Sequence, residues 1–345
     1  MNGSVLLLHR SDYGCCNTLL AEQVGMLGRY TEAFFPELVY VRPQGQIEKR
    51  DSLEGSAFID FPVDQTMIYP DYRRNTAELG KIQSSIDSVR NDTDITITSV
   101  WLKGYASPEG SYAHNKELAI GRTAALKRYI QQLYRFEGDV ITTDYEPEDW
   151  AGLRYYVERS NLAHRAEIVT LIDGNLEPDA KEWKIKRDYP MEYSFLLQNC
   201  YPALRHTDYR IAYTIRSYSD VEEIKRIMCE RPQKLDLNEF YLAAQEYEPG
   251  TDEFTEVFET AVRMFPDDTI ANLNAANAAM RRGDLTSAKR YLAKADDSPE
   301  AVYARGALAI RQKDYDSARR YLNEAKSLGL EQAGITLEQL EKGRR

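Results

Sequence analysis

The sequence contains few residues of the kinds that usually carry catalysis or bind metals. Its 345 residues include only 4 histidines, 4 cysteines and 3 tryptophans. The histidines show no helical ligand spacing, and the chain has neither a glycine-rich phosphate loop nor a GxSxG motif. The cysteines match no zinc pattern and no Cys-x-x-Cys redox pattern. We therefore expect a protein that is not an enzyme and that has no cofactor and no metal.

Long apolar runs and an excess of positive charge are also missing. No apolar run approaches the length that spans a bilayer, so we expect no membrane-spanning segment. The formal net charge is −11, and an acidic chain without a basic stripe argues against nucleic-acid binding. The 345 residues, 43% of them hydrophobic, suffice for two or three domains with cores of their own.

The four cysteines are Cys15, Cys16, Cys200 and Cys229. The adjacent pair cannot easily bridge without strain, because a disulfide requires a specific separation and dihedral angle. A bond from one of this pair to Cys200 or Cys229 is the alternative. We favour free, largely buried thiols, which are common in folded proteins.

The most informative motif lies in the first half of the chain. An alternating, β-branched segment at residues 95–102 is followed by turn residues 104–111 and by a helical pattern at residues 111–134. A strand, a tight turn and an amphipathic helix direct backbone N–H groups and the positive end of the helix dipole toward an anion. We therefore expect a small anionic ligand at this turn.

This motif resembles the OmpA-like peptidoglycan-binding domain. Gly110, Asn115, Leu118 and Arg122 fall in register with the pattern of that family. The resemblance implies that the Arg122 guanidinium forms a bidentate ion pair with a carboxylate of a diaminopimelate-containing stem peptide of peptidoglycan. The family also uses an Asp to hold the ammonium group of diaminopimelate. Ser107 stands at that position, and a neutral hydroxyl does not supply the missing charge.

Each candidate residue of the motif also has a structural interpretation. Arg122 would then be a helix-surface residue paired with an acid, Asn115 a brace for the turn, and Ser107 a plain turn residue. Glu109 is the only nearby acid that could replace the missing charge. The candidate ligand-binding residues are Arg122, Asn115, Ser107, Gly110, Leu118 and Glu109.

We expect the OmpA-like domain to span residues 56–219. The alternation and helical periodicity predict four strands and two helices, with a helical insertion at about 146–207 packed on one side of the sheet. The strands are expected at 56–69, with its family-like core at 58–61, and at 94–105, 140–143 and 209–216; the helices begin at Pro70 and at residue 111.

Residues 1–55 are expected to be a partial, β-rich N-terminal segment. Residues 14–17 are typical of a turn between two strands, and residues 46–55 are rich in charge and turn formers. The apolar run near the start is too short for a signal peptide. Because the resemblance implies a periplasmic or outer-membrane-associated protein, we expect that the native N-terminus is truncated here.

Residues 220–345 are predicted to be all helical and repetitive. Residues 283–292 recur at 313–322, which is 30 residues later. Their small-then-large pattern resembles tetratricopeptide repeats, whose units bury their apolar faces by stacking. The first helices of the units are expected at about 237–247, 269–281 and 299–311. The resemblance implies a protein partner held by residues 237–330.

Together these features predict an α+β protein. The expected architecture is an OmpA-like βαβαβ sandwich with a helical insertion, followed by an all-α tetratricopeptide-like helical array, as in Bacteroides-type cell-envelope proteins. The resemblance implies a peptidoglycan-associated anchor or adaptor. One alternative is an assembly scaffold of a fimbrial or outer-membrane system with a degenerate wall-binding site. A weaker alternative is a hydrolase of wall glycan, which only the acidic loop at 144–149, with Glu148, favours.

Overall fold

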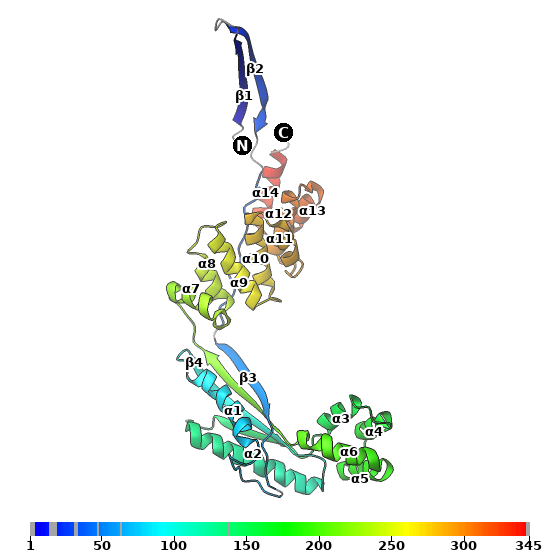
Figure 1. Ribbon diagram of the computed structural model, residues 1–345. Coiled ribbons are helices and arrows are strands. Elements are labelled where there is room, and N and C mark those ends of the chain that lie inside the picture. Colours follow the sequence, from blue (N-terminus) through cyan, green and yellow to red (C-terminus); the bar gives the residue numbers. More distant parts are fainter. Residues whose placement is uncertain are drawn as a thin grey trace. The chain divides into compact units, whose positions relative to one another are not determined.

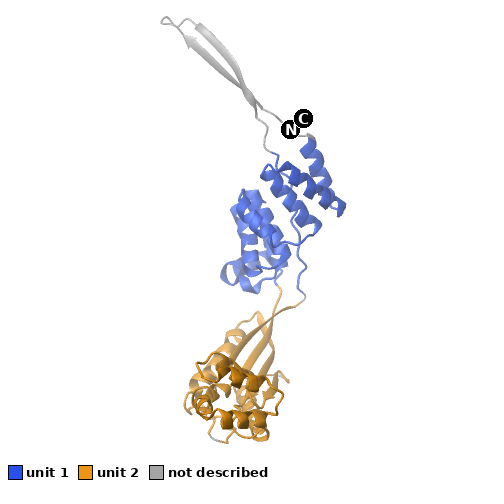
Figure 2. Ribbon diagram, turned by 90° about the vertical axis from the view of Figure 1, so that its right-hand side faces the viewer, with its two compact units in different colours: residues 1–47, 218–345 blue, residues 48–217 orange. Residues whose placement is uncertain are grey.

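The computed structural model describes residues 4–13, 19–30, 34–46, 48–62, 64–136 and 138–342. The chain forms two compact units, shown in different colours in Figure 2. One unit is Glu48–Ser217, called the α/β unit below. The other combines Met1–Ile47 with Tyr218–Arg345 and is called the repeat unit. The predicted α+β class is confirmed at this coarse level.

The α/β unit is built on a four-stranded mixed sheet with the order β3-β6-β4-β5 (Figure 1). β6 is antiparallel to both β3 and β4, whereas β4 and β5 are parallel. The bounds are β3 Lys49–Ala57, β4 Ile95–Tyr105, β5 Ile141–Glu146 and β6 Thr207–Ile215. The helices α1 (Asn75–Arg90) and α2 (Tyr112–Tyr134) share one core with the sheet, into which Ile82, Leu102 and Leu126 project.

The first strand lies earlier than the sequence indicated. The expected strand at 56–69, the expected helix start at Pro70 and the expected boundary at residue 56 are all wrong, because β3 begins at Lys49 and α1 begins at Asn75. β3 has few apolar residues and therefore weak strand periodicity. It is held by nine residue pairs with β6, whose alternation is strong.

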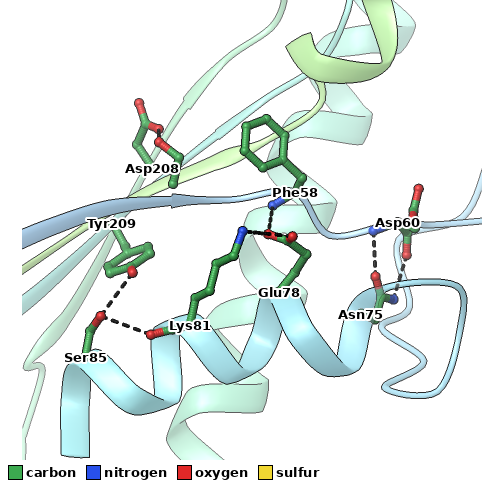
Figure 3. A network of polar contacts seen from close by, with 9 residues as sticks. Phe58, Asp60, Asn75, Glu78, Lys81, Ser85, Asp208 and Tyr209 are labelled. Atoms are coloured by element: carbon green, nitrogen blue, oxygen red, sulfur yellow. Dashed lines mark hydrogen bonds and ion pairs between the residues drawn. The ribbon is translucent and has the colours of Figure 1, made fainter. Parts of the chain in front are cut away.

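Side chains of α1 hold the segment that follows β3, as Figure 3 shows. The Asn75 amide accepts a hydrogen bond from the N–H of Asp60 at 2.7 Å and donates to the Asp60 carbonyl at 2.9 Å. Glu78 accepts from the N–H of Phe58 at 3.0 Å. These bonds replace a strand ladder, which is why residues 58–61 are ordered without being a strand.

The helical insertion has a core of its own. Its helices are α3 (Trp150–Glu158), α4 (Arg165–Asp173), α5 (Pro178–Asp188), α6 (Pro190–Asn199) and the 3₁₀ turn η1 (Tyr201–Leu204). Leu153, Ile168, Ile185 and Leu196 are buried together around Tyr201. The expectation that the insertion packs on one side of the sheet is wrong. The apolar faces of its helices pack against one another. The insertion follows β5 and precedes β6 in the chain, and it lies past the end of the sheet (Figure 1).

The repeat unit consists of paired helices. Its helices are α7 Val221–Glu230, η2 Pro232–Lys234, α8 Leu237–Ala244, α9 Asp252–Met264, α10 Thr269–Arg282, α11 Leu285–Leu292, α12 Pro299–Arg311, α13 Tyr315–Ser327 and α14 Glu331–Lys342. The three expected first helices correspond to α8, α10 and α12. The repeated sequence gives a repeated cap, because Asp284 and Asp314 each accept a hydrogen bond from the N–H three residues later. None of the described helices is long and apolar enough to cross a membrane.

The N-terminal residues do not form one separate β-rich segment. Strands β1 (Ser4–Tyr13) and β2 (Leu19–Tyr30) pair antiparallel, and the turn expected at 14–17 lies outside the described residues. Residues 34–46, called the N-terminal strap below, are extended but belong to no sheet. The strap packs against the helices of the repeat unit, so the expected single segment 1–55 is divided among three structural contexts.

Candidate ligand-binding site

Two glycines fix the turn between β4 and α2. A Cβ atom at Gly104 would lie 1.9 Å from the Thr123 hydroxyl oxygen, so only glycine lets β4 approach α2 this closely. Gly110 has φ of +93°, in the left-handed region that favours glycine. The turn is therefore held in one conformation against the first turns of the helix.

Three of the first amides of α2 already have acceptors within the protein. The N–H of Tyr112 donates to the Asp179 carboxylate of α5 at 2.7 Å. The N–H groups of His114 and Asn115 donate to the side chain and the carbonyl of Ser111. The insertion and the cap residue thus occupy these three amides, which are not available to the anion expected at this turn.

A pocket of about 800 Å³ opens beside the turn, which is large enough for a small peptide. One wall comes from residues 58–61 and a second from α6 and the η1 region, including Asn199 and Ala203. All six predicted ligand-binding residues line this pocket, namely Ser107, Glu109, Gly110, Asn115, Leu118 and Arg122. The structure thus brings the whole predicted set together in one concave place.

Arg122 presents its guanidinium to the pocket. Its Nε donates to the Gln65 carbonyl at 3.3 Å, and its guanidinium carbon lies 4.9 Å from the centre of the Phe61 ring. Burial, and then the nearby Arg205, lower the pKa of Arg122, while the negative charge of Asp64 acts in the opposite direction; a guanidinium stays charged at neutral pH. Arg122 has no ion pair with a carboxylate in the described part of the chain. Its two terminal nitrogens are thus placed to receive one.

Ser107 and Glu109 are both engaged by Arg205. Ser107 is only 3% exposed, and its hydroxyl accepts a hydrogen bond from Arg205 Nε at 3.0 Å. A terminal nitrogen of Arg205 forms an ion pair with Glu109. Sequence reasoning missed Arg205, which is 98 residues from Ser107 and follows the insertion. No local pattern around Arg205 indicated its position.

Asn115 braces the acidic loop as well as lining the pocket. Its amide donates to Glu148 Oε1 at 2.8 Å, and the Trp150 indole donates to the other oxygen at 2.8 Å. Burial raises the pKa of Glu148, although both hydrogen bonds act in the opposite direction. Glu148 is 4% exposed, and the pocket lining includes no carboxylate of loop 144–149.

The N-terminal strap packs along one face of the repeat helices α10 and α12. Asn274 of α10 both accepts from the N–H of Val41 at 2.9 Å and donates to its carbonyl at 2.7 Å. Asn277 donates to the Val39 carbonyl at 2.7 Å. The Tyr303 hydroxyl of α12 donates to the Glu37 carbonyl at 2.6 Å. Side chains of the repeats thus bind the backbone of the strap.

Apolar side chains of the strap complete the cores between the repeat helices. Leu38 is 7% exposed and joins a core with Leu273, Ala304 and Leu308. Tyr40 stacks on Phe258, with ring centres 5.4 Å apart. The strap therefore occupies this face with both backbone hydrogen bonds and buried side chains.

The thiols and potential metal ligands show no further site among the described residues. Cys200 is buried, Cys229 is exposed, and both are free. Cys15 and Cys16 lie outside the described residues. No group of three or more His, Cys, Asp or Glu side chains is arranged to hold a metal ion within the described ranges.

Comparison with known proteins gives no family for this chain. No family model matches the sequence, and no curated protein is significantly similar to it.

Proposed function

We propose that this protein is a non-enzymatic cell-envelope protein, periplasmic or outer-membrane-associated. Its α/β unit binds a stem peptide of peptidoglycan in the pocket beside the β4–α2 turn, and its repeat unit acts as an adaptor for a protein partner. The observation that carries the proposal is the Arg122 guanidinium, which faces the pocket without a carboxylate partner among the described residues.

Two further features support an OmpA-like anchor. The elements follow the β–α–β–α–β–β order that the resemblance implies, with the insertion delaying the last strand. The residues in register with the family motif line one pocket. A cationic fork in a concave site is the usual way in which proteins recognise a carboxylate.

The N-terminal strap limits where a protein partner can bind the repeat unit. The inner face of α10 and α12 is covered by the N-terminal strap. A partner held by residues 237–330 therefore uses a surface of these helices that the strap does not cover, or it displaces the strap.

One observation favours an assembly scaffold as the second candidate. Arg205 engages Ser107, which stands at the position of the family Asp, and Glu109, the nearby acid that could replace its charge. A pocket altered in this way fits a domain that kept the fold and lost the wall ligand. We do not propose a glycan hydrolase, because Glu148 lies outside the pocket and both of its oxygens already accept hydrogen bonds.

Co-sedimentation with purified peptidoglycan tests the anchor. We expect Arg122→Ala to weaken binding about tenfold or more, because the carboxylate of the stem peptide loses its ion pair with the guanidinium. The matched control is Arg128→Ala, an exposed arginine on the same helix that does not line the pocket. Equal sedimentation of the wild type and both variants would favour the scaffold instead.

A further inference from the structure

The charged side chains of the pocket differ in whether they have a partner of opposite charge. Four arginines and three carboxylates line it. Each carboxylate already has a basic neighbour, in the pairs Asp60–Arg73 at 3.3 Å, Asp64–His114 at 3.0 Å and Glu109–Arg205. Within the described lining, two arginines form no such pair: Arg74, which is exposed, and Arg122, which is half-buried. The pocket therefore offers Arg122 for a negative group, whereas its carboxylates already contact basic side chains.

An ammonium group would meet Arg205 at the position where the family Asp would hold it. The Arg205 guanidinium donates a hydrogen bond to the Ser107 hydroxyl. An ammonium group bound beside Ser107 would therefore lie close to the guanidinium, and the two positive charges would repel each other. Using Glu109 would require an incoming ammonium to displace the guanidinium from its ion pair. The pocket thus disfavours the free amino-acid end of diaminopimelate, in which an ammonium group stands beside the carboxylate.

Neutral groups surround the charged ones. Gln198 and Asn199 from α6 are exposed on one wall of the pocket, and their side-chain amides can both donate and accept. Phe61, Leu118 and Ala203 add apolar surface. Neutral amides beside apolar contacts suit a peptide bond and a short side chain.

We infer that the pocket takes a carboxylate whose neighbouring nitrogen is acylated, as at the C-terminal residue of a stem peptide, with Arg122 on the carboxylate. This inference rests on the proposed function, because it names the end of the stem peptide that the same pocket holds. Arg205 is then a specificity-determining residue that rejects the zwitterionic end.

Calorimetric titration with three probes tests the inference on the full chain. The probes are N-acetyl-D-alanyl-D-alanine, its C-terminal amide and free meso-diaminopimelate. We expect saturable binding of the acetylated acid, with the amide and diaminopimelate each about tenfold or more weaker. Arg122→Ala abolishes the difference between the acid and the amide, whereas Arg128→Ala leaves it unchanged.

Arg205→Ala separates specificity from a general loss of structure. This variant releases Glu109, so we expect the affinity for diaminopimelate to rise about tenfold while that for the acetylated acid changes little. Arg205→Gln, which keeps a hydrogen-bond donor for Ser107, gives the same result if the alanine variant does not fold.

The outcomes distinguish the inference from the proposed function. Tighter binding of diaminopimelate than of the acetylated acid, dependent on Arg122, overturns the inference and leaves the anchor intact. The same holds if no small probe binds while sedimentation with peptidoglycan still requires Arg122. Loss of both the probe binding and the Arg122-dependent sedimentation overturns the inference and the proposed function together.

Discussion

The two units differ in how the polar side chains of their concave surfaces are used. On the repeat helices, polar side chains donate hydrogen bonds to the backbone of the N-terminal strap; they are Asn274, Asn277 and Tyr303. In the α/β pocket, Arg122 keeps its terminal nitrogens free in the described part of the chain. One surface is therefore completed by the protein itself, and the other contains a guanidinium that forms no ion pair with the described residues.

Because of this difference, we expect the groove contacts to affect the stability of the fold and the pocket contacts to affect ligand binding. A groove filled by the chain's own residues adds buried apolar area and satisfied backbone groups to the folded state. A half-buried guanidinium without a carboxylate partner loses hydration without full compensation, and a bound carboxylate would recover that cost. We therefore expect substitutions in the groove to change stability, and substitutions in the pocket to change binding.

The largest effect is expected where the strap enters the core. Leu38→Ala removes a buried side chain and should lower the free energy of unfolding of the repeat unit by about 3 kcal/mol. Chemical denaturation followed by far-ultraviolet circular dichroism measures this loss. Leu328→Ala is the control, because Leu328 is 50% exposed in the same unit. Equal stability of the two variants would mean that the strap does not pack on the helices.

A smaller loss is expected from the polar contacts of the groove. Asn274→Ala leaves both the N–H and the carbonyl of Val41 without their partner, which should cost about 2 kcal/mol. Asn323→Ala, at an exposed position of α13, serves as the control in the same denaturation experiment. All three tryptophans lie in residues 48–217, so tryptophan fluorescence should report an unchanged α/β unit.

Changes in the pocket should alter ligand preference. Ser107→Asp alone should not create an ammonium site, because the new carboxylate would pair with Arg205. Ser107→Asp combined with Arg205→Ala should raise the affinity for diaminopimelate about tenfold, or about 1.4 kcal/mol. Calorimetry on the two variants checks this. A gain from the single variant would show that Arg205 does not control this position.

The smallest effect is expected in the pH dependence of the α/β unit. Because burial raises the pKa of Glu148 above its unfolded value, this group stabilises the fold below about pH 4.5 and loses that contribution as the pH rises through the folded pKa. Glu148→Gln should therefore gain stability relative to the wild type as the pH rises. Denaturation followed by tryptophan fluorescence measures the difference. A constant difference across this range would contradict the burial of an ionising group.

The centre of the α/β unit was predictable because its signals are local. The alternation at residues 95–102 and the cap at Ser111 placed β4 and α2 within a residue or two. β3 was misplaced because its residues, Lys49–Ala57, carry little periodicity and depend on β6 for pairing. The contact of Asp179, from the insertion, with the N–H of Tyr112 at the start of α2 left no local pattern in the sequence.

The remaining errors concern contacts between residues distant in sequence. Arg205 reaches Ser107 across 98 residues, and Asn277 reaches Val39 across 238. Neither contact leaves a periodic or spaced pattern in the chain. The strap is an extended segment without a sheet, and its sequence therefore gave no reason to place it against helices.

The most direct test of the contrast between the two units is NMR chemical-shift mapping of the full chain with a diaminopimelate-containing stem peptide. We predict saturable shifts at residues 104–122 and at Arg205, and none at Asn274, Asn277 or Tyr303. A flat titration at millimolar peptide, or shifts confined to the repeat helices, would contradict the assignment of the open pocket as the ligand site.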